Sequence, residues 1–67
     1  MLIRSINQNT LVDFNGNGVF WNNGAVCCAC GGIPIKIKST NDSLESKEVI
    51  DTIQDAFLRG EEIVTIE

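Results

Sequence analysis

Three turn signals divide the middle of the chain into short strands. The segments "NGNG" at 15 to 18 and "NNG" at 22 to 24 combine asparagine with glycine, and "GG" follows at 31 to 32. Asparagine and glycine tolerate the positive φ that tight hairpin turns require. We therefore expect a hairpin turn at each place, with "VFW" at 19 to 21 and "AVCCAC" at 25 to 30 as antiparallel neighbours.

The next segment, "IPIKIK" at 33 to 38, predicts a strand with one face in water. Its isoleucines occupy alternate positions and point to one face, whereas Pro34, Lys36 and Lys38 point to the other. Proline cannot donate to a strand ladder, and lysine discourages pairing with foreign strands. This strand is therefore expected at the edge of a sheet.

The two ends of the chain predict three further strands. Near the N-terminus, "MLIRSI" at 1 to 6 and "TLVDF" at 10 to 14 are rich in β-branched residues and are separated by the turn residues "NQN". At the other end, "EEIVTIE" alternates, with Val64 and Ile66 on one side. Five to six short strands result.

Residues 47 to 60, "KEVIDTIQDAFLRG", predict one amphipathic helix. Ser43 and Ser46 are the two candidates for its N-cap, and Gly60 is placed to end it. The apolar side chains fall within an arc of about 120°, formed by Val49, Ile50, Ile53, Ala56 and Phe57.

Together these elements predict a single α+β domain over residues 1–67. It would be an antiparallel β-meander with one C-terminal helix packed on one face and a short final strand. A domain this small buries only about 60% of the surface that its unfolded chain exposes. It usually needs a further source of stability, such as disulfides, a metal or self-association.

Charge and hydropathy exclude several partners. Nine acidic residues against five basic ones give a net charge of −4, which disfavours direct binding to nucleic acid or to an anionic membrane. The N-terminus reaches polar residues within four positions and so lacks the apolar run of a signal peptide or membrane span. We expect a protein of the cytoplasm, including that of an infected host.

The cysteines lie close together, at 27, 28 and 30. On a strand, Cys28 and Cys30 share one face and Cys27 points to the other, so three thiolates cannot converge on one ion. A disulfide between Cys28 and Cys30 would be close to the upper limit of allowed Cα separations. We interpret the three as small buried side chains and expect neither metal nor cofactor; a redox-sensitive thiol or an intermolecular bridge stays the minor alternative.

Enzymatic chemistry is the least favoured class, because the chain has no histidine and no nucleophile with a base beside it. Glu48, Asp51 and Asp55 form an acidic stripe at helical spacing. Such a stripe is usually a solvated helix face, and the alternatives are a mimic of a phosphate backbone or a site for a hard cation.

The middle strands suggest a surface that lacks a cover. "VFW" and "AVCCAC" carry apolar side chains on both faces, and one helix covers one face only. The sheet must curl on itself, stack on a second copy, or receive another macromolecule. We favour self-association, which would also stabilise a domain of this size.

Two segments carry a resemblance. "MLIRSINQNTLVDF" and "SKEVIDTIQDAFLRGEEIVTI" resemble very small proteins encoded by phages, prophages and mobile elements of Firmicutes, over about the first 14 and last 22 positions. Those proteins start with a strand of the form Met-hydrophobic-Ile-Arg and finish with a similar helix and strand. The resemblance implies a phage or mobile-element context, where small acidic proteins often inhibit host machinery, and it implies no activity or site residue.

Three functional hypotheses follow. The leading one is a small non-enzymatic interaction protein that forms a homo-oligomer through its sheet and binds or inhibits a host or phage protein, with Phe20, Trp21 and Leu58 as contact residues. For Trp21, the single tryptophan, a buried core position is the default and a binding anchor the alternative. The second is a sponge or sensor for a nucleotide, bound at an oligomer interface between the Asn-Gly loops and Lys36 or Lys38. The third is a nucleic-acid mimic of anti-CRISPR type that uses the acidic stripe.

Overall fold

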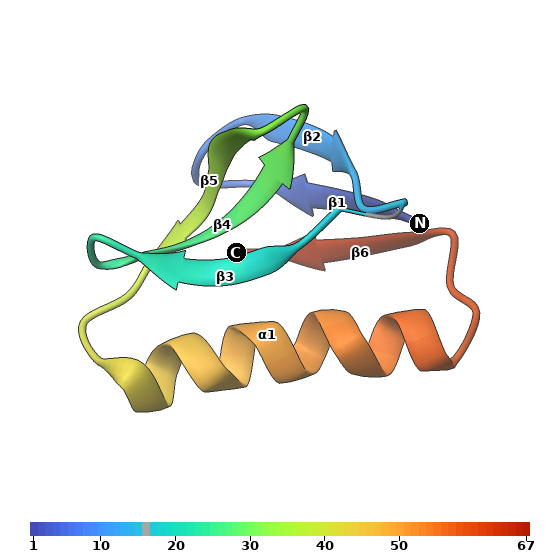
Figure 1. Cartoon of the computed structure of the whole chain (residues 1–67). Helices are drawn as coiled ribbons and strands as arrows, with labels where there is room; N and C mark the ends of the chain where they lie inside the picture. The colour runs from blue at the N-terminus through green and yellow to red at the C-terminus, as the bar shows by residue number, and fades with distance from the viewer. Residues whose placement is uncertain (16) are drawn as a thin grey trace.

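The computed structural model describes residues 1–15 and 17–67. It confirms the α+β class, with an antiparallel meander, a helix near the C-terminus and a short final strand (Figure 1). The elements in chain order are β1 (Leu2–Ser5), β2 (Thr10–Asp13), β3 (Val19–Asn22), β4 (Ala25–Cys30), β5 (Ile33–Ser39), α1 (Ser43–Leu58) and β6 (Ile63–Ile66).

The strands form two three-stranded sheets rather than one continuous meander. One sheet has the order β3-β4-β5, and the other has the order β2-β1-β6. In the second sheet β6 runs parallel to β1, with Ile3 opposite Val64. Parallel neighbours need a long connection. Here the chain passes through β2, the sheet β3-β4-β5 and α1 before β6 returns to the side of β1 (Figure 1).

Two of the three predicted hairpin turns are confirmed. Asn23 and Gly24 both have positive φ, as do Gly31 and Gly32, and each pair joins two antiparallel strands. The prediction for residues 15 to 18 was wrong, because β2 and β3 belong to different sheets and this segment connects them. Its Gly16 lies outside the described residues.

A β-bulge changes the direction of one predicted side chain. β5 is an edge strand, as expected, but Ile37 has no partner on β4, since Lys36 pairs with Cys27 and Lys38 pairs with Val26. The extra residue reverses the alternation. Lys38 therefore lies on the same face as Val26, beside α1, and not with Lys36 as the sequence pattern suggested.

The ends of α1 are capped by one unexpected and one expected residue. Asp42, with an extended backbone, is the N-cap, and its Oδ1 accepts a hydrogen bond of 2.8 Å from the Glu45 amide. The prediction of Ser43 or Ser46 was wrong, because both already lie in the helix, where the Ser46 hydroxyl donates to the Ser43 carbonyl. Gly60, with a φ of 73°, follows the C-cap as predicted.

One core is shared by both sheets and the helix. Its buried members come from β1, β2, β4, β5, α1 and β6: Ile3, Val12, Val26, Cys28, Ile37, Val49, Ile53, Ala56, Val64 and Ile66. Within the described residues, no helix has the length and apolar character needed to span a membrane.

The predicted bare second face of the middle strands is smaller than the sequence suggested. On β4, Ala25 and Cys27 point away from the shared core yet are only 5% and 6% exposed. Cys27 lies in one row across the sheet between the larger Phe20 and Lys36. Large apolar side chains do remain exposed, but most of them lie on other elements.

Candidate binding surfaces

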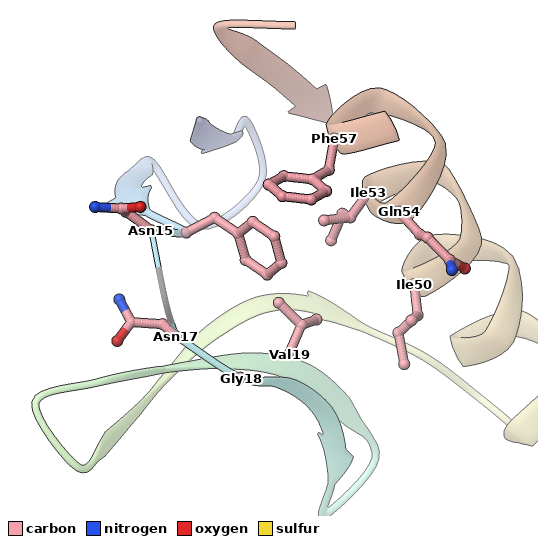
Figure 2. A pocket seen from close by; sticks show the side chains of 9 residues that line it. Asn15, Asn17, Gly18, Val19, Ile50, Ile53, Gln54 and Phe57 are labelled. Carbon is pink, nitrogen blue, oxygen red and sulfur yellow. The ribbon is translucent and has the colours of Figure 1, made fainter. Parts of the chain in front are cut away.

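A groove of about 450 Å³ runs between α1 and the segment that joins β2 to β3. Its apolar lining includes Val19, Ile50, Ile53 and Phe57, which Figure 2 labels, together with Phe14. We call it the Phe14–Phe57 groove; its lining residues are Phe14, Asn15, Asn17, Gly18, Val19, Ile50, Ile53, Gln54 and Phe57.

Backbone hydrogen bonds hold the loop side of the groove in place. The Phe14 amide donates to the Met1 carbonyl at 2.9 Å, and the Asn17 amide donates to the Phe14 carbonyl at 2.9 Å. The Asp13 carboxylate accepts from the Asn15 amide, while the Asn17 side-chain amide donates to the Asp13 carbonyl. Phe14 is thereby presented to the helix.

The two aromatic rings meet edge to face. The ring centroids of Phe14 and Phe57 are 5.5 Å apart, and the ring planes make an angle of 79°. Phe57 belongs to the predicted apolar arc of the helix, yet it is 56% exposed. An edge-to-face pair orients the rings without removing them from solvent, so an aromatic surface is left open at the end of the groove.

The groove has an apolar interior and an uncharged polar margin. None of the described lining residues is ionisable. Figure 2 shows Phe57, Ile53 and Ile50 projecting from α1 toward the side of Val19, while the amide groups of Asn15, Asn17 and Gln54 lie at the margin. Such a site suits an apolar or aromatic group with hydrogen-bonding atoms at its edge.

A second exposed surface is the outer face of the sheet β2-β1-β6. Ile3, Ser5 and Val12 point into the core, so their neighbours along the strands point outward. We call this surface the β1 outer face; its residues are Leu2, Arg4, Leu11, Asp13, Ile63 and Thr65. Leu2, Leu11 and Ile63 are 37%, 52% and 48% exposed.

The predicted contact residues do not form one surface. Phe20 and Trp21 are adjacent on β3, so they point to opposite faces of the sheet, and they are 36% and 46% exposed. Trp21 pairs with Val26 and Phe20 with Cys27. Leu58 is 73% exposed at the last residue of α1. All three are accessible, but they are not brought together.

The acidic stripe is partly neutralised. The Lys47 ammonium lies 2.7 Å from the Asp51 carboxylate, one helical turn away, and this contact raises the pKa of Lys47. Glu48 borders a hollow that Lys38 also lines, and Asp55 is exposed. A lysine paired with one of the acids, and a second lysine beside another, weaken the resemblance to a phosphate backbone.

The elements proposed for a nucleotide site are also separated. Lys36 and Lys38 lie on opposite faces of the sheet because of the bulge. The Asn-Gly segments precede and follow β3, so the length of that strand separates them. The nucleotide hypothesis places the ligand at an oligomer interface and needs only one of the two lysines, so it stays a hypothesis.

The cysteines have the arrangement that strand alternation predicted. All three are free thiols, and the Sγ atoms of Cys28 and Cys30 are 3.9 Å apart, while Cys27 points to the other face. Burial, followed by the contact with Cys30, raises the pKa of Cys28 to about 11. No group of three or more potential metal ligands gathers within residues 1–15 and 17–67.

The sequence pattern missed the two surfaces described above. Phe14 and Phe57 were each placed on their correct element, but nothing local showed that they meet. The β1 outer face had a signal, since "LIRSI" and "TLVD" each begin their apolar run with two adjacent aliphatic residues, of which strand alternation must turn one outward. No family model, curated protein or solved structure matches this chain.

Proposed function

We propose that this chain is a small non-enzymatic interaction protein that binds an apolar anchor side chain of a partner protein in the Phe14–Phe57 groove and self-associates through a sheet face. The observation that carries the proposal is the groove itself, in which an aromatic side chain that is 56% exposed lies beside apolar residues, and none of the described lining residues is ionisable.

The chemistry of the groove favours a protein side chain as its occupant. Its volume of about 450 Å³ is within the range of small-ligand sites, but it is open to solvent at Phe57, which is 56% exposed. An uncharged aromatic or branched anchor would pack on Phe57 and Ile50, and its backbone would meet the amides of Asn15 and Asn17. Aromatic anchors in apolar pockets are typical binding hot spots.

The chain's other chemistry agrees with a binding role. It contains no histidine, and the raised pKa of Cys28 keeps that thiol protonated at neutral pH, where it is a poor nucleophile. The resemblance to phage and mobile-element proteins suggests a host or phage protein as the partner, whose activity this chain would inhibit.

The groove can be tested by NMR with short model peptides. Four peptides of the form Gly-Gly-X-Gly-Gly, with blocked ends and X as Trp, Phe, Leu or Ala, are titrated into labelled protein. We expect shifts of the Asn15, Asn17 and Gln54 side-chain amides with Trp and Phe, weaker shifts with Leu, and none with Ala. Equal responses to all four peptides, or responses confined to other residues, would contradict the proposal.

Phe57→Ala and Leu58→Ala form a matched pair of variants. Both residues are exposed near the end of α1, but only Phe57 lines the groove. We expect Phe57→Ala to reduce binding of the Trp peptide at least tenfold and Leu58→Ala to leave it unchanged. The opposite result would favour Leu58, one of the contact residues predicted from the sequence, as the anchor point.

A further inference from the structure

Four residues of the β1 outer face form a quadrilateral with a particular symmetry. Leu2 pairs with Asp13 across the two strands, and Arg4 pairs with Leu11. Leu2 and Arg4 are two positions apart on β1, as Leu11 and Asp13 are on β2, so all four point outward. The two leucines therefore occupy one diagonal, and the two opposite charges occupy the other.

We infer that this face is the interface of a two-fold homodimer, in which the axis runs along the leucine diagonal. A rotation of 180° about that line places Leu2 against Leu2 of the second copy and Leu11 against Leu11 of the second copy. It also exchanges the ends of the other diagonal, so Arg4 of each copy faces Asp13 of the other. The inference rests on the proposed self-association and specifies where it occurs.

The charges favour a second copy over a different partner. The face carries one positive and one negative side chain, so it is complementary to itself under this rotation. Among the ion pairs of the described residues, neither Arg4 nor Asp13 takes part. One Asp13 oxygen accepts from the Asn15 amide, which holds the carboxylate in place and leaves its other oxygen to receive a guanidinium.

The surrounding residues extend the apolar contact. Ile63 lies beside Leu2 on β6, and Ile6 follows β1; each is 48% exposed. With the axis oblique to the strands, the strands of the two copies cross at a large angle, which is the orthogonal class of sheet packing. Such a dimer would bury four aliphatic residues per copy, the additional burial that a domain of this size lacks.

Charge reversal tests the interface in the intact chain. Arg4→Asp and Asp13→Arg are each expected to raise the dimer dissociation constant at least tenfold in sedimentation velocity, because each places like charges opposite one another. An equimolar mixture of the two variants should recover the dimer, since one then presents two acidic side chains and the other two arginines. A charge pair within one chain would give no such recovery.

Matched controls separate the specific effect from net charge and folding. Lys36→Asp changes the net charge as Arg4→Asp does, and Asp55→Arg matches Asp13→Arg; both lie outside the face and should leave the dimer intact. Asp13→Asn keeps an acceptor for the Asn15 amide and should weaken the dimer less than Asp13→Arg. Circular dichroism checks that each variant is folded.

The outcomes distinguish the interface from self-association in general. A wild-type chain that is monomeric at all concentrations would overturn both this interface and self-association. An oligomer that is insensitive to both charge reversals, or a mixture that does not recover, would overturn the interface alone and leave self-association standing. The groove is tested independently by the peptide titrations.

Discussion

At the scale of single residues, the fold makes the thiol of Cys28 less acidic than an ordinary cysteine thiol. The side chain is completely buried in the shared core, with its sulfur 3.9 Å from that of Cys30. Burial first, then the hydrogen bond and charge of Cys30, and then the charge of Asp13 raise its pKa from 9.0 to about 11. The folded state therefore retains a proton that the unfolded chain gives up earlier.

This shift predicts a loss of stability at alkaline pH. Below pH 9 both states hold the proton, and the contribution of Cys28 is fully present; as the pH rises from 9 to 11, only the unfolded state loses it. The free energy of unfolding should fall by about 2 to 3 kcal/mol over that interval. Urea denaturation at several pH values under reducing conditions measures this free energy, and Cys28→Ala should make its decline with pH less steep. Equal slopes in both proteins would show that other groups cause the loss.

At the scale of elements, α1 starts at Ser43, before the predicted residue 47, and its start depends on Asp42, which the sequence pattern did not select as N-cap. The sequence offers several cap residues in "STNDSLES", and local preference alone does not choose among them. Asp42 has the extended backbone that an N-cap needs, and its carboxylate is 2.8 Å from the Glu45 amide. A carboxylate here also interacts favourably with the helix dipole.

Asp42→Ala should therefore lower the free energy of unfolding by about 1 kcal/mol, whereas Asp42→Asn should change it by a few tenths. Ser43→Ala is the control, because Ser43 is exposed within the first turn and its side chain makes none of the capping bonds. Chemical denaturation compares the three variants. A larger loss of unfolding free energy from Ser43→Ala than from Asp42→Ala would instead indicate Ser43, one of the two predicted residues, as the N-cap.

At the scale of the whole molecule, the two sheets are tied together at the bulge. Ile37 has no partner on β4, and its carbonyl accepts a hydrogen bond from the Ser5 hydroxyl, which comes from the other sheet. Ser5 is fully buried. A polar side chain in a small core is costly unless it is hydrogen-bonded, and this bond satisfies both the serine and the irregular strand.

Ser5→Ala should remove the only side-chain donor shown at the Ile37 carbonyl within the described part of the chain. Leaving a buried acceptor unpaired costs roughly 1 to 3 kcal/mol, so the midpoint of urea denaturation should fall accordingly. Ser39→Ala, at an exposed position of β5, should have little effect. If both substitutions were equally mild, the bond between the sheets would contribute nothing to stability.

The sequence by itself determined the local elements of this protein. Apolar and β-branched runs between turn signals predicted the six strands, Asn23-Gly24 and Gly31-Gly32 predicted two hairpins, and the apolar arc followed by Gly60 predicted the helix. These signals depend on neighbouring residues and on φ preferences, so they can be read along the chain.

Only the tertiary structure decided how those elements meet. The division into two sheets, the parallel pairing of β6 with β1, the bulge at Ile37 and the contact of Phe14 with Phe57 all join residues distant in sequence. Such contacts depend on which packing fills one shared core, and no short segment encodes that choice. For this reason the Phe14–Phe57 groove became visible only in the folded chain, and the aliphatic residues of β1 and β2 formed one outer face only once these strands were paired.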